Sequence, residues 1–212
     1  MDINTIKSNL RDYYNHEAVY RSTREKQGWK VEPREAFRDL LFQENKKHLL
    51  EIGAGTGQDS QFFMENGLDV IAVDLSKEMV RICKEKGINA FELDFYNICE
   101  LNKKFDCVWA MNTLLHVPKS DLPGVLQNID AVLNADGLFY VGVYGGEDTE
   151  HTWVNDQQDQ SNAPRFFSLY SEAKLKEALQ EVFEIISFRQ LDSGRGIDFQ
   201  SVIMRKKLNP PL

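Results

Sequence analysis

The sequence has few cysteines and few histidines, and neither type is spaced for binding a metal. Three of the 212 residues are cysteines (Cys83, Cys99 and Cys107), and no two of them form a C-x-x-C pair. The four histidines show no H-x-x-H spacing. These absences argue against a zinc site and against a disulfide framework. We therefore expect reduced cysteines, no metal and a cytoplasmic protein.

Long apolar runs and an excess of basic residues are also missing. No run of 18 apolar residues occurs, and the first seven residues lack the apolar core of a signal peptide. The formal net charge is −8, whereas a nucleic-acid-binding protein usually carries a basic face. We therefore expect no membrane partner, and the charge argues against a nucleic acid. Without repeats or a low-complexity linker, residues 1–212 are expected to form a single domain.

The most informative segment runs from Leu49 to Asp59 and reads L-L-E-I-G-A-G-T-G-Q-D. An apolar strand leads into a turn with alternating glycines and then into a helix. Glycine lets the backbone approach a ligand closely, and the free N–H groups of the helix point at the occupant of the turn. The segment indicates a site for a mononucleotide-like cofactor.

The glycine spacing differs from the dinucleotide fingerprint G-x-G-x-x-G. That pattern would place its third glycine at position 58, where Gln58 stands, and Glu51 occupies a position that is normally apolar. The next apolar run ends in Asp74, whose carboxylate can accept hydrogen bonds from both hydroxyls of a ribose. A nicotinamide oxidoreductase is therefore disfavoured.

The pattern E-x-G-x-G-x-G followed by a strand that ends in Asp resembles the class I S-adenosylmethionine (SAM)-dependent methyltransferases. The likeness covers roughly residues 35–205 and continues, in the family's order, through Phe91–Phe95, Phe105–Asn112, Leu114–Pro118 and Leu133–Val141. It implies an α/β fold with a doubly wound, Rossmann-like, seven-stranded sheet, mostly parallel, with an antiparallel C-terminal strand pair. It also implies methyl transfer from SAM by in-line displacement, with S-adenosylhomocysteine (SAH) as the product.

The resemblance further implies roles for single residues. Gly53, Gly55 and Gly57 would face the methionyl and ribose parts of the cofactor, and Glu51 would orient its amino group. Asp74 would hold the ribose hydroxyls, and Asp94 would contact the adenine amino group. The other expected cofactor contacts are Ala54, Leu75, Met79, Phe95, Met111 and Tyr14.

His116 follows the segment that resembles the family's fourth strand. It is a candidate for the substrate contact or general base, and the alternative is a packed histidine that is hydrogen-bonded to the backbone. Tyr13, Tyr14 and Tyr144 are candidates to face the sulfonium with their rings, although core packing explains each of them equally well.

Hydrophobic periodicity predicts the remaining elements. The first 45 residues are expected to be helical and to form a lid, and residues 145–165 are expected to be a lid-like or merely solvated loop. Acids in this loop would favour a cationic acceptor: Glu147, Asp148, Glu150, Asp156 and Asp159. Helices are predicted over 58–66, 77–86, 121–133 and 172–182, and strands over 184–191 and 197–205.

The acceptor is expected to be a small molecule, because the two predicted lids would enclose a pocket. Two alternatives stay open, a tRNA-modifying SAM methyltransferase and a non-catalytic SAM-binding module. Nothing in the sequence indicates an oligomeric state.

Overall fold

The structure is a computed structural model in which residues 2–154, 163–194 and 196–208 are described. The α-helices are α1 (Ile3–Ser22), α2 (Val31–Gln43), α3 (Gln58–Glu65), α4 (Lys77–Glu85), α5 (Leu122–Val132) and α6 (Glu172–Gln180). The strands are β1 (His48–Ile52), β2 (Asp69–Asp74), β3 (Asn89–Glu92), β4 (Phe105–Met111), β5 (Leu133–Tyr144), β6 (Thr149–Trp153), β7 (Arg165–Leu169), β8 (Phe183–Asp192) and β9 (Asp198–Lys206). Short 3₁₀ helices are η1 (Gly28–Lys30), η2 (Ile98–Leu101) and η3 (Leu114–His116).

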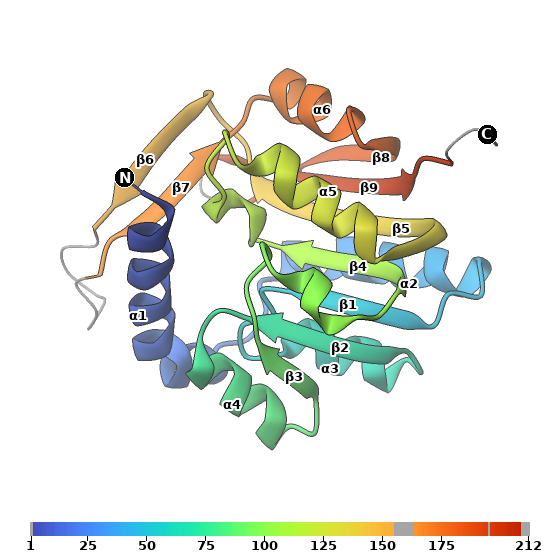
Figure 1. Cartoon of the computed structure of the whole chain (residues 1–212), viewed down its shortest axis with the longest axis horizontal. Coiled ribbons are helices and arrows are strands. Elements are labelled where there is room, and N and C mark those ends of the chain that lie inside the picture. The colour runs from blue at the N-terminus through green and yellow to red at the C-terminus, as the bar shows by residue number, and fades with distance from the viewer. Residues whose placement is uncertain (1, 155–162, 195, 209–212) are drawn as a thin grey trace.

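Seven strands form one sheet in the order β3-β2-β1-β4-β5-β9-β8 (Figure 1). The strands β3, β2, β1, β4 and β5 are parallel to one another, and β9 pairs antiparallel with both β5 and β8. The central strands are buried along almost their whole length, as parallel strands must be when helices cover both faces of a sheet. The expected Rossmann-like fold with an antiparallel C-terminal pair is confirmed.

Side chains that alternate along the strands form two helix-covered faces. One face packs against α2, α3 and α4, and its centre is Trp109, which stacks on Tyr140 with ring centroids 3.8 Å apart. The other face packs against α5 and α6, with Val108 and Val141 among its buried side chains. The sheet is therefore the middle of three layers, and its strand ends are the places left for a ligand.

The predicted helices and C-terminal strands are confirmed to within two residues at each end. Ser76 caps α4 as expected, with its hydroxyl accepting from the Met79 N–H at 3.2 Å. The third strand lies slightly earlier than the resemblance suggested, so Asp94 and Phe95 occupy the loop after β3.

About half of the described part of the predicted loop 145–165 lies in strands rather than in irregular structure. Strand β6 pairs antiparallel with β7 in a separate two-stranded sheet, and His151 stacks on Phe167 across the pair. The prediction of an irregular loop was wrong here, because the side chains of residues 149–153 are mostly polar and do not alternate like those of a typical strand. The pairing partner of this strand, β7, begins only at Arg165. Asp156 and Asp159 lie outside the described residues.

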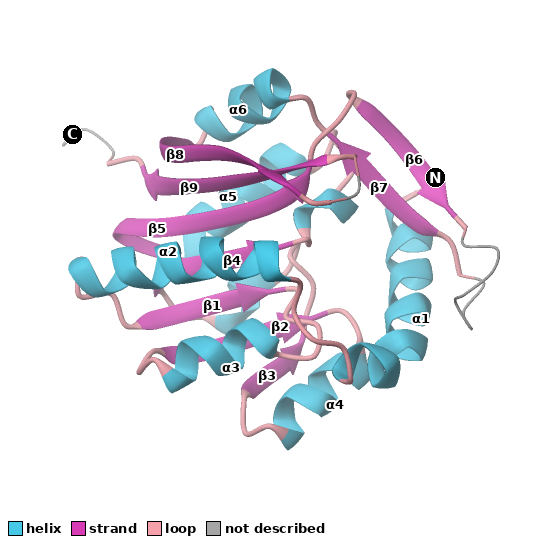
Figure 2. Ribbon diagram, turned by 180° about the vertical axis from the view of Figure 1, so that it is seen from behind, coloured by secondary structure: helices cyan, strands magenta, loops and turns pink. Residues whose placement is uncertain are grey.

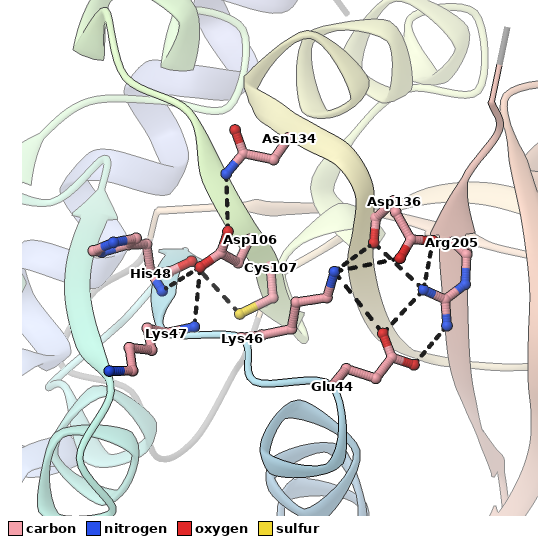
Figure 3. A network of polar contacts seen from close by, with 9 residues as sticks. All are labelled: Glu44, Lys46, Lys47, His48, Asp106, Cys107, Asn134, Asp136 and Arg205. Atoms are coloured by element: carbon pink, nitrogen blue, oxygen red, sulfur yellow. Dashed lines mark hydrogen bonds and ion pairs between the residues drawn. The ribbon is translucent and has the colours of Figure 1, made fainter.

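A polar network joins the segments at the amino-terminal edge of the parallel strands (Figure 3). Arg205 near the end of β9 pairs with Glu44 at 2.6 Å and with Asp136 at 2.7 Å. Asp106 accepts hydrogen bonds from the backbone N–H groups of Lys47 and His48, both at 3.0 Å. These contacts fasten the start of β1 to β4, β5 and β9, and they lie at the edge opposite the glycine turn.

Helix α1 stands across the carboxyl-terminal edge of the parallel strands, below the β6–β7 hairpin (Figure 2). It packs against α4 through Ala18, Met79 and Ile82, and it also touches β7. Helix α1 and strand β7 thus touch at the edge where ligands bind in such folds. Within the described ranges, none of the helices is long and apolar enough to cross a membrane.

Candidate functional site

A cavity of about 360 Å³ opens at the carboxyl-terminal edge of β1, β2 and β4. Its walls come from the glycine turn, from the loops after β2, β3 and β4, and from α1, the 24–30 segment and β7. All the predicted cofactor residues and His116 line the cavity, with the exception of Gly57. Tyr144 also lines it, whereas Tyr13 is a buried core residue.

The glycine turn is shaped by close packing beneath it. Gly53 has φ +71°, and a Cβ at this position would overlap the Thr113 side chain. A Cβ on Gly55 would meet nothing within 4 Å. Gly57, with φ +76°, faces Ile88 and Cys83 instead of the cavity. Gly57 is absent from the cavity lining, and its lack of a Cβ allows α4 to pack closely on the turn; its expected contact with the cofactor stays a prediction.

Asp74 ends β2 with its carboxylate held by two backbone groups. The Gly55 N–H donates to its Oδ2, and the Ser76 N–H donates to its Oδ1, both at 2.8 Å. Burial raises the pKa of Asp74, and these two hydrogen bonds oppose the rise. A carboxylate has about four acceptor positions, so the fixed Asp74 can still accept from two hydroxyls.

Asp94 is held by a partner that the sequence did not reveal. Its Oδ2 pairs with Lys7 of α1 at 2.8 Å, and its Oδ1 accepts from the Tyr96 N–H at 2.9 Å. Leu75, Met79 and Phe95 supply apolar walls to the cavity that Asp94 and Asp74 also line. Two acids and apolar walls in one cavity suit a purine nucleoside, which has polar atoms and a flat apolar ring.

Glu51 lies beneath the glycine turn among charged residues. Ser60 donates a hydrogen bond to it, and burial, reinforced by the negative charge of Asp59, raises the pKa of Glu51 to about 8. Asp59 pairs with Lys26 at 2.7 Å and Arg34 at 3.2 Å, and it accepts from the Trp109 indole at 3.1 Å. Sequence reasoning missed Asp59 and Lys26, because only the folded 24–30 segment brings Lys26 to the turn.

His116 is buried and lines the cavity. Its Nδ1 lies 2.7 Å from the Phe166 carbonyl oxygen, and its Nε2 lies 2.7 Å from the Tyr14 hydroxyl. The carbonyl can only accept, so Nδ1 carries the proton and Nε2 accepts from Tyr14. Burial lowers the pKa of His116 to about 4, so the imidazole is neutral near pH 7. His116 is therefore a packed histidine that is hydrogen-bonded to the backbone, as one alternative held. It also lines the cavity, so its role as a substrate contact or general base stays a prediction.

Asn112 is a further cavity residue that sequence reasoning missed. It follows β4 with φ +57°, and its N–H donates to the Gly142 carbonyl at 2.8 Å. Its side-chain Oδ1 is buried without a hydrogen-bond partner among the described residues. An orphaned acceptor in a ligand cavity fits a donor supplied by the ligand, such as an ammonium group. Asparagine directly after an apolar strand is the signal, because it tolerates left-handed backbone.

A methyltransferase-domain family model matches residues 23–186, which is more than half of the chain. The chain belongs to the class I SAM-dependent methyltransferases. SAM is the cofactor of this family, and the carboxylates, apolar walls and orphaned amide oxygen of the cavity fit its nucleoside and amino acid parts.

Relatives of this methyltransferase are distant in sequence. An uncharacterized methyltransferase of Oceanobacillus iheyensis is 24% identical over 182 residues, covering 79% of this chain and 81% of that protein. For several other curated relatives, the matched part is less than half of their own length.

Solved structures share the fold across almost the whole chain. The 1,6-didemethyltoxoflavin-N1-methyltransferase of Burkholderia thailandensis, crystallised with its namesake compound and SAH, has a TM-score of 0.71 and 20% identity, covering 96% of this chain and 88% of that chain. The magnesium protoporphyrin IX methyltransferase of Synechocystis PCC 6803, crystallised with SAM, has a TM-score of 0.73 and 15% identity, covering 98% of both chains.

Proposed function

We propose that this methyltransferase transfers the methyl group of SAM to a small organic acceptor. The observation that carries the proposal is that the glycine turn, Asp74 and the hydrogen-bonded Tyr14–His116 pair all line the same cavity. One end of the cavity suits the cofactor, and the other leaves a polar place for an acceptor beneath α1. SAM supplies a methyl group already activated on a sulfonium, so the protein's main task is to hold the reacting atoms in line.

Individual residues are assigned by their position in the cavity. Asp74 holds the ribose hydroxyls, and Asp94, fixed by Lys7, receives the adenine amino group beside the Phe95 backbone. Glu51 and Asn112 receive the ammonium group of the methionyl part. The remaining cofactor contacts are Gly53, Ala54, Gly55, Leu75, Met79, Met111 and Tyr14.

Helix α1 and the β6–β7 hairpin are proposed to act as lids of one domain that spans residues 1–212. Both line the cavity, α1 through Leu10 and Tyr14 and the hairpin through Phe167. Their closure would exclude water and larger partners, which favours a small molecule over a tRNA. We place the protein in the cytoplasm, in keeping with the buried free thiols of Cys83 and Cys107.

Replacing the ribose ligand tests the assignment of the cofactor end. Asp74→Asn is expected to weaken SAH binding by about tenfold or more, because hydrogen bonds to a charged group are worth about 1.5–3 kcal/mol. Asp69→Asn is the matched control, since Asp69 begins the same strand at the opposite edge and its side chain is 77% exposed. Isothermal titration calorimetry measures both constants, and equal SAH affinities in the two variants would refute the assignment.

Turnover is tested with SAM labelled in the methyl group and a panel of small hydroxyl, carboxylate and amine acceptors. Transfer of label to one class supports the enzyme. Tight SAH binding with no transfer to any acceptor, under conditions where a control methyltransferase is active, would favour a non-catalytic SAM-binding module.

A further inference from the structure

Helix α1 carries a lysine that reaches the acid to which the adenine amino group is assigned. The Lys7 ammonium pairs with Asp94 Oδ2 at 2.8 Å, and the two side chains are 21% and 10% exposed. The ion pair is therefore largely shielded from water. Asp94 lines the cavity, whereas Lys7 is absent from its lining in the part of the chain that the structure describes. Lys7 thus acts on the carboxylate from outside the cavity.

The position of the Lys7 ammonium is itself fixed. It lies over the Tyr96 ring, 4.2 Å from the centroid, and a cation over an aromatic face is attracted to it. The Tyr96 hydroxyl donates to Asp121 at 2.9 Å, and the Tyr96 carbonyl accepts from the Asn128 side chain at 2.8 Å. Because α5 holds the ring in this way, the ammonium has a defined place between the ring and Asp94.

A second polar contact fixes α1 along its length. Asn15 lies about two turns after Lys7, and its side-chain oxygen accepts from the Ser76 hydroxyl at 2.7 Å. Ser76 also donates its N–H to Asp74, so α1 touches the loops that carry both acids of the proposed nucleoside site. A helix held at two points presents Lys7 to Asp94 in a defined position.

Both oxygens of Asp94 therefore have a protein partner. Oδ1 accepts from the Tyr96 N–H at 2.9 Å, and Oδ2 holds Lys7. A carboxylate has about four acceptor positions, so about two remain for a ligand, and the two partners set their directions. Without Lys7, one oxygen would lose its partner, and the terminal torsion of an aspartate has only a broad preference of its own. A site that holds an acceptor in place rejects a ligand that lacks the matching donor.

We propose that Lys7 is a positioning residue for cofactor recognition. By fixing the Asp94 carboxylate from α1, it makes the cavity select an amino group on the purine over an oxygen at the same place. This role rests on the proposed function, in which Asp94 receives the adenine amino group. It extends adenine recognition to a residue of α1 that does not touch the cofactor.

The test compares SAH with S-inosylhomocysteine, in which an oxygen replaces the amino group of the purine. Calorimetry at constant ionic strength gives both dissociation constants for each protein. The wild type is expected to bind SAH at least about tenfold more tightly, because the oxygen cannot donate to Asp94. Lys7→Gln is expected to weaken SAH binding about five- to tenfold and to change S-inosylhomocysteine binding less than about twofold. Lys7→Arg keeps the positive charge and should recover most of the preference.

Two further variants separate the route through Asp94 from the loss of a charge. Arg11→Gln removes one positive charge from the next turn of α1 and should keep the preference, since the ion pair with Asp94 belongs to Lys7. In an Asp94→Asn background, Lys7→Gln should change the preference less than about twofold, because the carboxylate on which Lys7 acts is gone.

A lysine that only helps α1 to dock would weaken both ligands by the same factor in Lys7→Gln, and that result would overturn the proposal. Tighter SAH binding by Lys7→Gln would also overturn it, because the ammonium would then compete with adenine for the carboxylate. A wild type that binds SAH without preferring it refutes the role of Lys7 and leaves cofactor binding intact. A wild type that binds neither ligand refutes the proposed function as well.

Discussion

The buried Glu51 makes the stability of the fold depend on pH in a direction opposite to that of an ordinary surface acid. Its pKa is about 8 in the folded chain against 4.5 for the free group. Between these values the folded chain holds a proton that the unfolded chain lacks, so stability falls as the pH rises. The slope approaches about 1.4 kcal/mol per pH unit, and the loss between pH 6 and 8 is about 2 kcal/mol.

Glu51→Gln removes this titration and keeps the shape and hydrogen-bonding capacity of the protonated acid. Urea denaturation at pH 6 and pH 8 should show the wild type losing about 2 kcal/mol more than the variant, or roughly 5 °C in thermal unfolding. Glu65→Gln at the exposed end of α3 is the control and should change with pH as the wild type does. A wild type and a Glu51→Gln variant with the same pH dependence would refute the buried, protonated Glu51.

Further predictions concern the glycine turn and the histidine. Gly53→Ala should lower the free energy of unfolding in urea by about 2–4 kcal/mol, because a positive φ and overlap with Thr113 act together. Gly67→Ala, also at positive φ but in open space, should lower it by about 1 kcal/mol. Equal losses in the two variants would contradict the close packing under the turn. His116 has a folded pKa of about 4, below the usual 6.5, so the stability it contributes above pH 6.5 is lost as the pH falls toward 4. His116→Asn should therefore lose less stability than the wild type between pH 7 and pH 4.5, and a parallel loss in both proteins would show that the imidazole is not buried neutral.

Much of the fold follows from local patterns in the sequence. The buried runs of β1, β2 and β4 read as strands because parallel strands are apolar on both faces. Ser76 and Ser171 could be predicted as helix caps, and the side chain of each accepts a backbone hydrogen bond in the structure. Much of the cofactor end of the cavity could be predicted for the same reason, since the glycine turn, Asp74, Asp94 and Met111 lie at or just after the ends of strands at one edge of the sheet.

The rest of the cavity could not be predicted from local patterns, because it is assembled by contacts between distant segments. Arg21 and Lys26 reach the cavity only through the packing of α1 and the segment after it, which no local periodicity encodes. The β6–β7 hairpin depends on pairing across residues 154–164, and its polar strand resembled a loop. Gly57 was assigned by motif, whereas its packing against Ile88 is a three-dimensional property.

The most direct test of the account is the thermal stability of ligand-free protein with SAM, SAH and NADH in parallel. A ligand at 100 times its Kd adds about 2.7 kcal/mol, or roughly 5–10 °C for a chain of this size. The account predicts such a shift with SAM and SAH and none with NADH. A shift with NADH alone, or none with either sulfur compound in protein shown to be free of copurified ligand, would contradict it.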